Sequence, residues 1–455
     1  MLSTPLPSPL REPAIGVEAA STLVAHLDDA LMAGFARLGP SHRDALDRVA
    51  AALAGSPLGG VVREAAAAAR VGPPSEAHLI ALAAGREALL GAMHDALLAQ
   101  ALALTGRPAE LPSPATRITT LGGDPSALVA ARQWLVELAL GGLASAGPDG
   151  VLPFGANLER LQEDRALARL SALLTGLFDE LCDLLPLASA DQAPARRWAD
   201  LWSRALLQAV GRAELAEATV EKGRFSCFAM DVRHHAHVVS VALWGLWLPD
   251  GAEARVARAT LSGWRVPAIA GPESWHALKG AFGPLLQAVA EGRAWDASAT
   301  VYSTGDLRLQ GGAAGPALDP FAVAALAMAA PLPVPVGADR HPVQLGVPLL
   351  FEVPPQGKDA SSVPFGDGVL PISYTRTSEV QNISPAALAP CARWIGLLRW
   401  DDGAWSVSPL VGQNRAGKKP VHVGPLDGLA AELKGTSEAL SILRERAGKL
   451  LRVKS

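Results

Sequence analysis

The feature that most constrains the fold is a change of hydrophobic periodicity near Arg212. From about Gly16 to Gly211, apolar residues recur every three and four positions with almost no β-branched runs, which is typical of amphipathic helices. From Thr219 to Gln310 the chain alternates and is rich in valine and tryptophan, as strands are. The chain of 455 residues is therefore predicted to be α+β, with an all-helical N-terminal array or bundle followed by a mainly antiparallel α+β C-terminal region.

Residues 16–211 are predicted to form one all-helical domain of about seven helices with short connections. Ser75 stands at an expected N-cap, and Pro125 follows the capping residue Asp124. No fixed sequence period indicates a solenoid. The predicted helices are Val17–Leu38, Ser41–Ala54, Leu58–Val71, Ser75–Leu104, Pro125–Ala146, Asn157–Leu185 and Ala193–Val210. On the last of these, Trp198 and Trp202 share one face and are expected to be core.

Residues 219–310 are predicted to form an α+β domain with two hairpins around one helix. The hairpin turns are Pro249-Asp250-Gly251 and Ser303-Thr304-Gly305-Asp306, and the helix is Pro272–Glu291. This order of elements with short turns favours a mainly antiparallel sheet.

Residues 311–455 are predicted to form a connector, a β-hairpin and a C-terminal helix, either separate from the preceding domain or continuous with it. A strand is expected in His341–Val353, and the Gly- and Pro-containing loop Pro354–Gly368 is a candidate flap or linker. The hairpin turns at Asp401-Asp402-Gly403, and the terminal helix spans Pro425–Leu451.

Two segments were considered as targeting or membrane signals. Residues 1–15 hold four prolines and lack a basic start before an apolar run, so we expect a disordered arm and not a signal peptide. The uncharged stretch Pro320–Ala338 has membrane length, but prolines interrupt its second half and alanines dominate its first. A short buried helix followed by an extended connector is expected there.

Charge and cysteine usage narrow the class of protein. A formal net charge of -4 offers no basic stripe for nucleic acid, so no nucleic-acid partner is expected. Cys182, Cys227 and Cys391 lie far apart without a C-x-x-C motif, which indicates neither a disulfide framework nor a cysteine zinc site. A reducing, cytoplasmic compartment is expected. Abundant alanine, arginine and glycine are typical of a GC-rich bacterial genome.

The segment Asp231-Val232-Arg233-His234-His235-Ala236-His237 holds three of the ten histidines within four positions. If Phe225–Leu248 is one extended segment, Asp231, His235 and His237 share a face. An H-x-H pair on a strand can bind zinc, copper, iron or nickel through neutral imidazoles.

Two imidazoles alone do not make a metal site, because a catalytic zinc usually has three protein ligands and a structural zinc four. Asp231, Cys227 and His276 are the candidates for a third ligand. None lies at a spacing that requires a metal. In the competing interpretation the histidines line the wet end of a strand and Arg233 pairs with Asp231.

Two further features are candidate interaction sites. Gly412–Lys419 has the spacing of a phosphate-binding loop, but Lys419 replaces the magnesium-binding Ser or Thr and Pro420 stands where a helix should begin. No nucleotide is therefore expected, and Lys418 and Lys419 are candidate contacts to an acidic partner. Trp244 and Trp247 lie three apart and face opposite sides of a strand, so one can be core while the other is a lid or a partner surface.

The absence of complete catalytic motifs favours a non-enzymatic protein. No H-E-x-x-H, no G-x-G-x-x-G after a strand and no nucleophile elbow occurs. The favoured prediction is a cytosolic scaffold or adaptor subunit of a larger bacterial assembly, which binds other proteins and no cofactor. The alternative is a metal-dependent enzyme or metal-binding protein centred on His235 and His237, with Arg233 orienting an anionic substrate.

Overall fold

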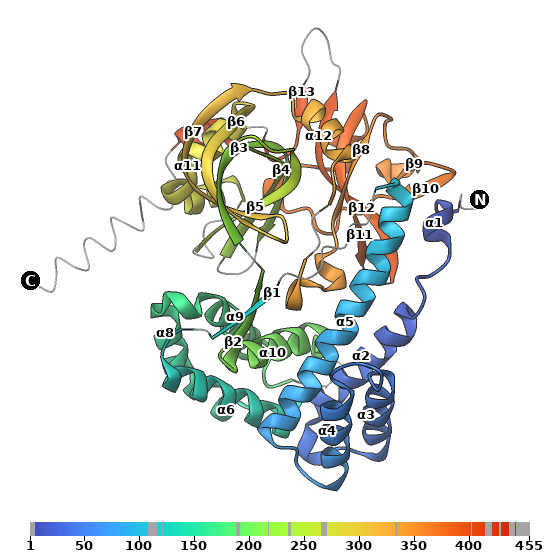
Figure 1. The fold of residues 1–455 in the computed structure, drawn as a ribbon, viewed down its shortest axis with the longest axis vertical. Helices are drawn as coiled ribbons and strands as arrows, with labels where there is room; N and C mark the ends of the chain where they lie inside the picture. The colour runs from blue at the N-terminus through green and yellow to red at the C-terminus, as the bar shows by residue number, and fades with distance from the viewer. Residues whose placement is uncertain are drawn as a thin grey trace, which may run out of the picture.

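The computed structural model confirms an α+β chain with an N-terminal helical array and a mainly antiparallel C-terminal region (Figure 1). The structure describes residues 5–107, 116–120, 122–187, 192–216, 218–234, 238–264, 271–332, 335–401, 403–414, 421–426, 429–435 and 442. In Figure 1 the helical array forms the lower part and the sheets form the upper part. Helix α5 (Glu76–Thr105) runs from one into the other.

The remaining helices of the array are close to the predicted ones. They are α2 (Val17–Ala33), α3 (Pro40–Ala52), α4 (Gly59–Val71), α6 (Pro125–Gly141), α7 (Pro148–Val151), α8 (Gly155–Glu163), α9 (Ala168–Leu184) and α10 (Ala195–Ala209). Ser75 and Asp124 cap α5 and α6 as predicted. The predicted helix Asn157–Leu185 is wrong in one respect, because α8 ends before Asp164. The Asp164 side chain accepts a hydrogen bond from the Ala166 backbone N–H at 2.9 Å and starts a new turn.

The array contains an internal duplication that has no fixed sequence period. Helices α2 and α6 have 17 residues each, and each is followed by a glycine, a 3₁₀ turn and a Gly-Pro that starts the next helix. Helices α2 to α5 pack in a ring, as do α6, α8, α9 and α10, and α5 contacts α10 between the two rings. The partner helices differ in length, since α5 has 30 residues and α10 has 15. No constant period therefore appears in the sequence.

Two glycines hold the duplicated halves together at their equivalent turns. Gly34 and Gly142 have φ angles of 93° and 91°. A Cβ on Gly34 would lie 2.7 Å from the Gly141 carbonyl carbon, and one on Gly142 would lie 2.7 Å from the Met32 carbonyl oxygen. Both positions combine a left-handed backbone with backbone-to-backbone contact, which only glycine allows. The shared pattern Gly-x-Ala-x-x-Gly-Pro at residues 34–40 and 142–148 is the sequence signal of the duplication.

A five-stranded barrel follows the array. Its strands are β3 (Ala218–His234), β4 (Val238–Pro249), β5 (Arg255–Trp264), β6 (Arg293–Tyr302) and β7 (Asp306–Ala317). They close in the order β3-β4-β5-β7-β6, with β5 and β7 parallel and helix α11 (His276–Ala290) between β5 and β6. This is the connectivity of an OB-fold barrel, which hosts many functions and determines none by itself. Both predicted hairpins are confirmed as β4–β5 and β6–β7.

A second, four-stranded antiparallel sheet lies beside the barrel in the order β13-β12-β11-β8. Its strands are β8 (Val347–Phe351), β11 (Arg393–Asp401), β12 (Ala404–Asn414) and β13 (Val421–Val423). Trp400 pairs with Trp405 across the predicted hairpin. Helix α12 (Pro320–Ala329) confirms the short helix expected in this region, and one of its faces, with Phe321 and Ala324, is buried. Of the predicted terminal helix Pro425–Leu451 the structure shows α14 (Leu429–Lys434), and most of the remainder lies outside the described residues.

Three predicted segments differ from the structure. The boundary at residue 310 falls inside β7. The arm expected to be disordered is ordered from residue 5, because Leu10 of helix α1 (Ser8–Arg11) is buried and the Val369 N–H donates to the Pro5 carbonyl at 3.1 Å. The loop Pro354–Gly368 contains β9 (Ser362–Phe365), which pairs with β10 (Gly368–Pro371).

A two-stranded ribbon of β1 (Thr116–Thr120) and β2 (Arg212–Ala216) joins the two chain segments that leave the array.

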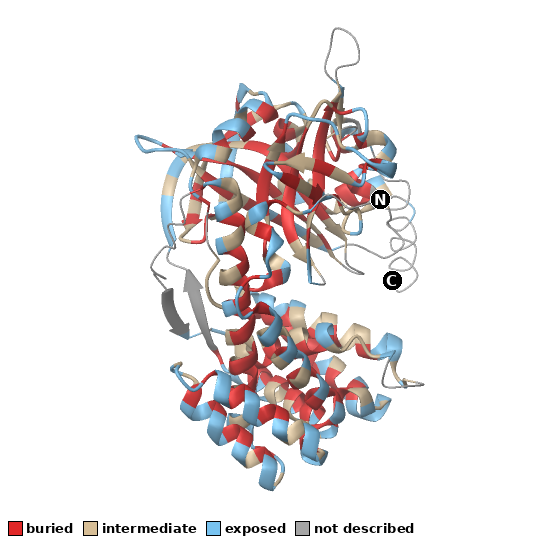
Figure 2. Cartoon of the chain, turned by 90° about the vertical axis from the view of Figure 1, so that its right-hand side faces the viewer, coloured by how far each residue is buried: buried red, intermediate tan, exposed pale blue. Residues whose placement is uncertain are grey.

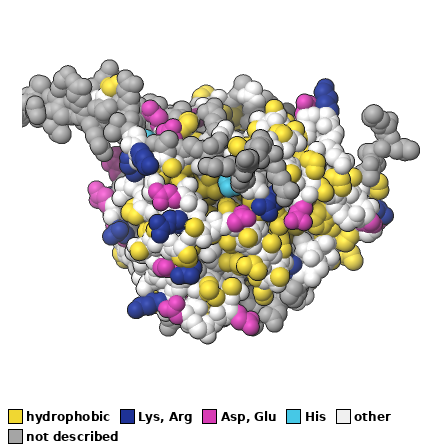
Figure 3. Space-filling view, turned by 90° about the horizontal axis from the view of Figure 1, so that it is seen from above, with side chains coloured by type: hydrophobic (Ala, Val, Ile, Leu, Met, Phe, Trp, Pro, Cys, Tyr) yellow, Lys and Arg dark blue, Asp and Glu magenta, His cyan; other side chains and the backbone are white. Residues whose placement is uncertain are grey.

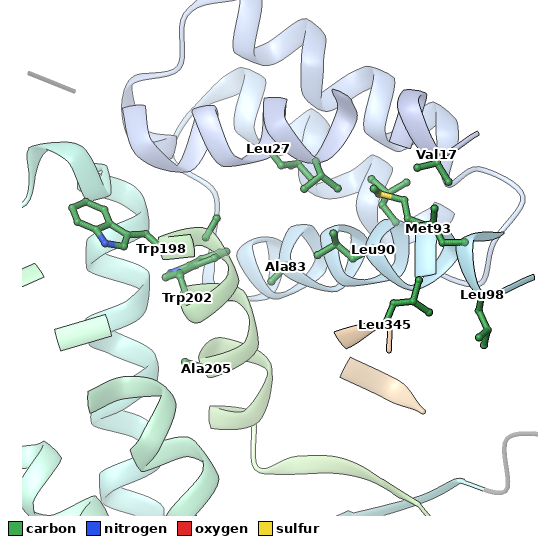
Figure 4. Packing of buried hydrophobic residues seen from close by; sticks show 14 of the residues in the cluster. Val17, Leu27, Ala83, Leu90, Met93, Leu98, Trp198, Trp202, Ala205 and Leu345 are labelled. Carbon is green, nitrogen blue, oxygen red and sulfur yellow. The ribbon is translucent and has the colours of Figure 1, made fainter. Parts of the chain in front are cut away.

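Two hydrophobic cores stabilise the molecule. One fills the barrel around Trp247, and the other runs without interruption from the helical array into the C-terminal sheet. Figure 2 shows this second core as buried residues along α5 and into the sheet above it. In Figure 4, Leu90 and Met93 of α5 lie between Leu27 of α2 and Leu345 of the C-terminal region. Trp198 and Trp202 are buried, as their shared helical face predicts.

Helix α5 is the one described helix that is long and apolar enough to span a membrane. Half of its most apolar stretch is buried against other parts of the chain. Length and composition alone do not separate such a core helix from a membrane span.

Candidate functional site

The histidine segment is a chain reversal and not a continuous strand. Strand β3 ends at His234, β4 begins at Val238, and His234 pairs with Val239 in antiparallel register. His235 and His237 therefore fall between two strands, and both lie outside the described residues. The single strand predicted across Phe225–Leu248 is therefore two strands, and where His235 and His237 lie relative to Asp231 stays a prediction.

Asp231 is buried between two arginines. Its carboxylate accepts hydrogen bonds from Arg399 Nη2 at 2.7 Å and from Arg233 Nη2 at 3.0 Å. Burial alone would raise the pKa of the Asp231 carboxyl, but the charges of Arg399 and Arg233 outweigh it and lower the pKa. The structure therefore agrees with the interpretation in which Arg233 pairs with Asp231, and it adds Arg399 as a deeper partner.

The other candidate metal ligands do not gather around Asp231. Cys227 is buried among the hydrophobic residues of the barrel, and burial raises the pKa of its thiol to about 12. His276 is the first residue of α11. Within the described ranges, no three His, Cys, Asp or Glu side chains are grouped so that they could hold a metal ion.

The end of β3 is a joint between the barrel and the C-terminal sheet. Next to Asp231, the buried Gln381 side chain accepts from the Val232 N–H at 2.9 Å and donates to the Met230 and Leu410 carbonyls at 2.9 and 3.2 Å. These three bonds connect β3 to β12. Together with the Asp231–Arg399 pair, these bonds link the barrel and the C-terminal sheet through buried polar side chains.

A second buried joint lies in the helical array. Arg86 of α5 donates a hydrogen bond from Nε to the Asp28 carboxylate at 2.7 Å. Its Nη1 lies 2.6 Å from the carboxylate of Asp200 on α10. His341 Nδ1 accepts from the Val343 N–H at 3.0 Å, so the proton on Nε2 faces Asp200 at 3.3 Å. Burial raises the pKa of Asp28 to about 6 despite Arg86. Burial would also raise the pKa of Asp200, but His341 and Arg86 lower this pKa to about 2.

A cavity of about 240 Å³ opens beside this second joint, between α5, α10 and β11. Its charged side chains are bound to neighbours: Arg376 pairs with Asp401, and Arg196 donates to Ser21 Oγ at 3.1 Å. Both ring nitrogens of His341 are also engaged. The cavity thus has no free general base among the groups described above.

An open groove of about 730 Å³ crosses the outside of the barrel. Its floor comes from β3, β6 and β7, and the β4–β5 turn forms one wall. The residues that line it include Lys222, Gly223, Arg224, Leu248, Asp250, Asp296, Ala297, Ser298, Gln310, Gly312 and Ala313. On β7 the residues from Gln310 to Ala314 are exposed, and the strand bulges at Gly311 and Gly312, so a stretch of mostly small side chains faces solvent.

Gly312 allows β7 to form this part of the floor. Gly312 has a φ of 129°, and a Cβ there would lie 2.4 Å from Trp295 Nε1. The Trp295 indole donates to the Gly311 carbonyl at 3.0 Å, so β7 lies directly on the edge of the ring. A larger residue at position 312 would lift β7 away from the barrel.

The groove is polar and mixed in charge. Arg224 and Asp296 pair at 2.6 Å in the groove with both side chains about half exposed, at 43% and 45%. Lys222 is exposed at the same strand, and the apolar side chains of Val220 and Leu248 are 73% and 45% exposed nearby. Figure 3 views the molecule from above and shows basic and acidic side chains interspersed with apolar ones on the face that it presents. Sequence analysis missed the groove because its lining residues are ordinary surface types.

The predicted interaction residues lie elsewhere. Trp244 and Trp247 face opposite sides of β4 as expected, but both are buried, so neither is at a free surface. Lys418 and Lys419 lie outside the described residues. Gly412–Asn414, the start of the apparent phosphate-binding loop, belongs to β12 and pairs with β13.

No protein-family model, curated protein or solved structure matches this chain. Its function is therefore inferred from its own geometry.

Proposed function

We propose that the protein is a non-enzymatic adaptor or scaffold subunit that binds an extended segment of another protein in the barrel groove. The observation that carries this proposal is the exposed half of β7, where small side chains form the floor of an open groove. Extended peptides bind surfaces on which their backbone lies close to the floor and their side chains reach the walls.

The buried charges support an adaptor role over a catalytic one. The buried pair Asp231–Arg399 connects the barrel to the C-terminal sheet, and the buried pair Asp28–Arg86 connects two helices of the array. A scaffold needs such joints because its parts must keep their relative positions when a partner binds. The hydrophobic core that runs along α5 also keeps the helical array and the C-terminal sheet in their relative positions.

The groove also indicates the chemistry of its partner. Asp296 neutralises Arg224, which leaves the exposed Lys222 on β3 as a cation, the exposed Asp250 at the β4–β5 turn as an anion and Leu248 as an apolar contact. A segment that carries an acidic, a basic and an apolar residue complements this pattern. Cys182, Cys227 and Cys391 are all free thiols, which supports the proposal of a reducing, cytoplasmic location.

Affinity purification with matched variants tests this function. Ala313→Arg places a long side chain on the groove floor, and Ala67→Arg makes the same exposed change on α4, far from the groove. We expect a stoichiometric partner with the wild type and with Ala67→Arg, and its loss with Ala313→Arg. Titration of the purified partner should show at least a tenfold weaker Kd. Equal binding by all three proteins would rule out the groove.

A further inference from the structure

The buried cluster around Arg86 holds more carboxylates than cations. The Arg86 guanidinium contacts three carboxylates, those of Asp28 at 2.7 Å, Asp200 at 2.6 Å and Glu87 at 3.4 Å. The side chains of Arg86, Asp28 and Glu87 are 3%, 4% and 10% exposed. Arg196 is the second cation near Asp28, and it is exposed to solvent. Three carboxylates therefore face one buried and one exposed guanidinium.

The joint at Asp231 has the opposite imbalance. There, Arg399 and Arg233 share one carboxylate, and burial lowers the pKa of Arg399 to about 10. Burial also acts to lower the pKa of Arg86, but Asp28 and Asp200 outweigh it and raise this pKa. Crowded carboxylates do not all ionise readily, because like charges at close range repel each other. A proton on one of the carboxyl groups would relieve the surplus negative charge around Arg86.

Asp28 is the carboxyl group best placed to take this proton. It is the least exposed of the three, since the side chain of Asp200 is 24% exposed. Glu87 accepts from the Ser203 hydroxyl at 2.7 Å and Asp200 faces His341, whereas Asp28 has Arg86 as its one hydrogen-bond partner within the described part of the chain. Hydrogen bonds to a carboxylate favour its charged form. Burial raises the pKa of Asp28 to about 6.

The charged groups that act on Asp28 come from two helices. Arg86 of α5 opposes protonation of Asp28 most strongly and Arg196 of α10 opposes it less, whereas Asp200 of α10 favours it. Helices α3 and α6 also pack on α2, and their ion pairs are formed with other helices: Asp44 and Asp47 of α3 pair with Arg70, and Arg132 of α6 pairs with Glu76.

We propose that this cluster is a proton-linked joint, in which Asp28 takes up a proton in mildly acidic solution and the helical array is then held more firmly to the C-terminal region. Once Asp28 is neutral, Arg86 is shared by fewer charges and binds Asp200 more strongly. Asp200 in turn holds His341 of the C-terminal region. This device is separate from the barrel groove and does not depend on the adaptor proposal.

The sign of the pH dependence follows from the raised pKa. The unfolded pKa of an aspartate is about 3.9, so the contribution of Asp28 to stability is fully present below about pH 4 and is lost as pH rises through about 6. This is the opposite of the dependence expected for Asp231, whose folded pKa is lowered.

Urea unfolding of the full chain between pH 7.5 and pH 5 tests the proposal with Asp28→Asn, which imitates the neutral carboxyl. At pH 7.5 the urea midpoint of Asp28→Asn should equal or exceed that of the wild type. As pH falls to 5, the midpoint of the wild type should rise relative to that of the variant. The control Asp44→Asn changes an exposed carboxylate of the same array that pairs with Arg70, and its midpoint should follow the wild type at every pH.

Carboxyl NMR provides the second measurement. In protein labelled with ¹³C-aspartate, one carboxyl resonance of the wild type should titrate with a midpoint near pH 6 and be absent from Asp28→Asn. The proposal is overturned if every aspartate titrates below pH 5, or if the midpoint difference between wild type and Asp28→Asn does not change with pH. It is also overturned if Asp28→Asn fails to fold at pH 7.5, because the charge of Asp28 would then be required.

Discussion

Replacing Asp231 by asparagine should lower the free energy of unfolding by about 3–5 kcal/mol, the usual effect of removing one partner from a buried ion pair. Asparagine keeps the shape of the side chain and removes its charge. Arg399 is 1% exposed, so its guanidinium would be left buried without a counter-charge. Arg233, which shares the same carboxylate, would add to the repulsion.

A matched control lies in the same barrel. Asp296 pairs with Arg224 at 2.6 Å, a distance similar to the 2.7 Å between Asp231 and Arg399. The side chains of Asp296 and Arg224 are, however, both about half exposed. Exposed ion pairs contribute about 0–1 kcal/mol because water screens the charges. Asp296→Asn should therefore change the free energy of unfolding by no more than about 1 kcal/mol. The contrast between the two variants isolates the effect of burial.

Urea unfolding followed by tryptophan fluorescence measures both variants, and its pH dependence provides a sign test. The folded pKa of Asp231 lies below the unfolded value of about 3.9. The contribution of the Asp231 carboxylate to the free energy of unfolding is therefore fully present above pH 4 and disappears as pH falls through the folded pKa. The difference between wild type and Asp231→Asn should stay constant from pH 7 to about pH 4 and shrink at lower pH.

Two results would refute this reasoning. Equal small losses in Asp231→Asn and Asp296→Asn would show that Arg399 is not left uncompensated. If the pair serves only as a joint, the apolar double variant Asp231→Leu with Arg399→Met should regain most of the lost free energy. If the double variant does not regain this free energy of unfolding, the charges of Asp231 and Arg399 do more than connect the two sheets.

Three further predictions concern residues singled out from the sequence. A double-mutant cycle between Trp400 and Trp405 should give a coupling of about 0.2–1 kcal/mol, since the two pair across the β11–β12 hairpin, and a coupling of zero would contradict this. Lys418→Ala should change the free energy of unfolding by less than about 0.5 kcal/mol, and fluorescent ATP analogues should not bind; magnesium-dependent micromolar binding would be the opposing result. Elemental analysis of the untagged protein should find no stoichiometric transition metal, whereas a metal that survives dialysis and is lost when His235 and His237 become glutamine would establish the alternative function.

The candidate sites show why sequence pattern alone was insufficient for function. Nothing at residues 235–237 is a glycine, proline or asparagine, so the reversal between β3 and β4 carried no turn signal and the segment was predicted as one strand. Asp231 and Arg399 are 168 residues apart, and Arg86 lies 58 residues from Asp28. Ion pairs at such separations depend on how distant elements pack, and no local pattern records them.

The sequence by itself determined the features that arise within a few residues. Ser75 and Asp124 cap their helices because a side-chain oxygen reaches a backbone N–H two or three residues away. The hairpin at Gly403 follows from turn residues between two apolar strands. Tertiary structure alone decided that β3 closes on β6, that α5 carries one continuous core from the helical array into the C-terminal sheet, and that β7 lies exposed over Trp295. These outcomes depend on long-range register and burial, which are set when the whole chain excludes water from its core.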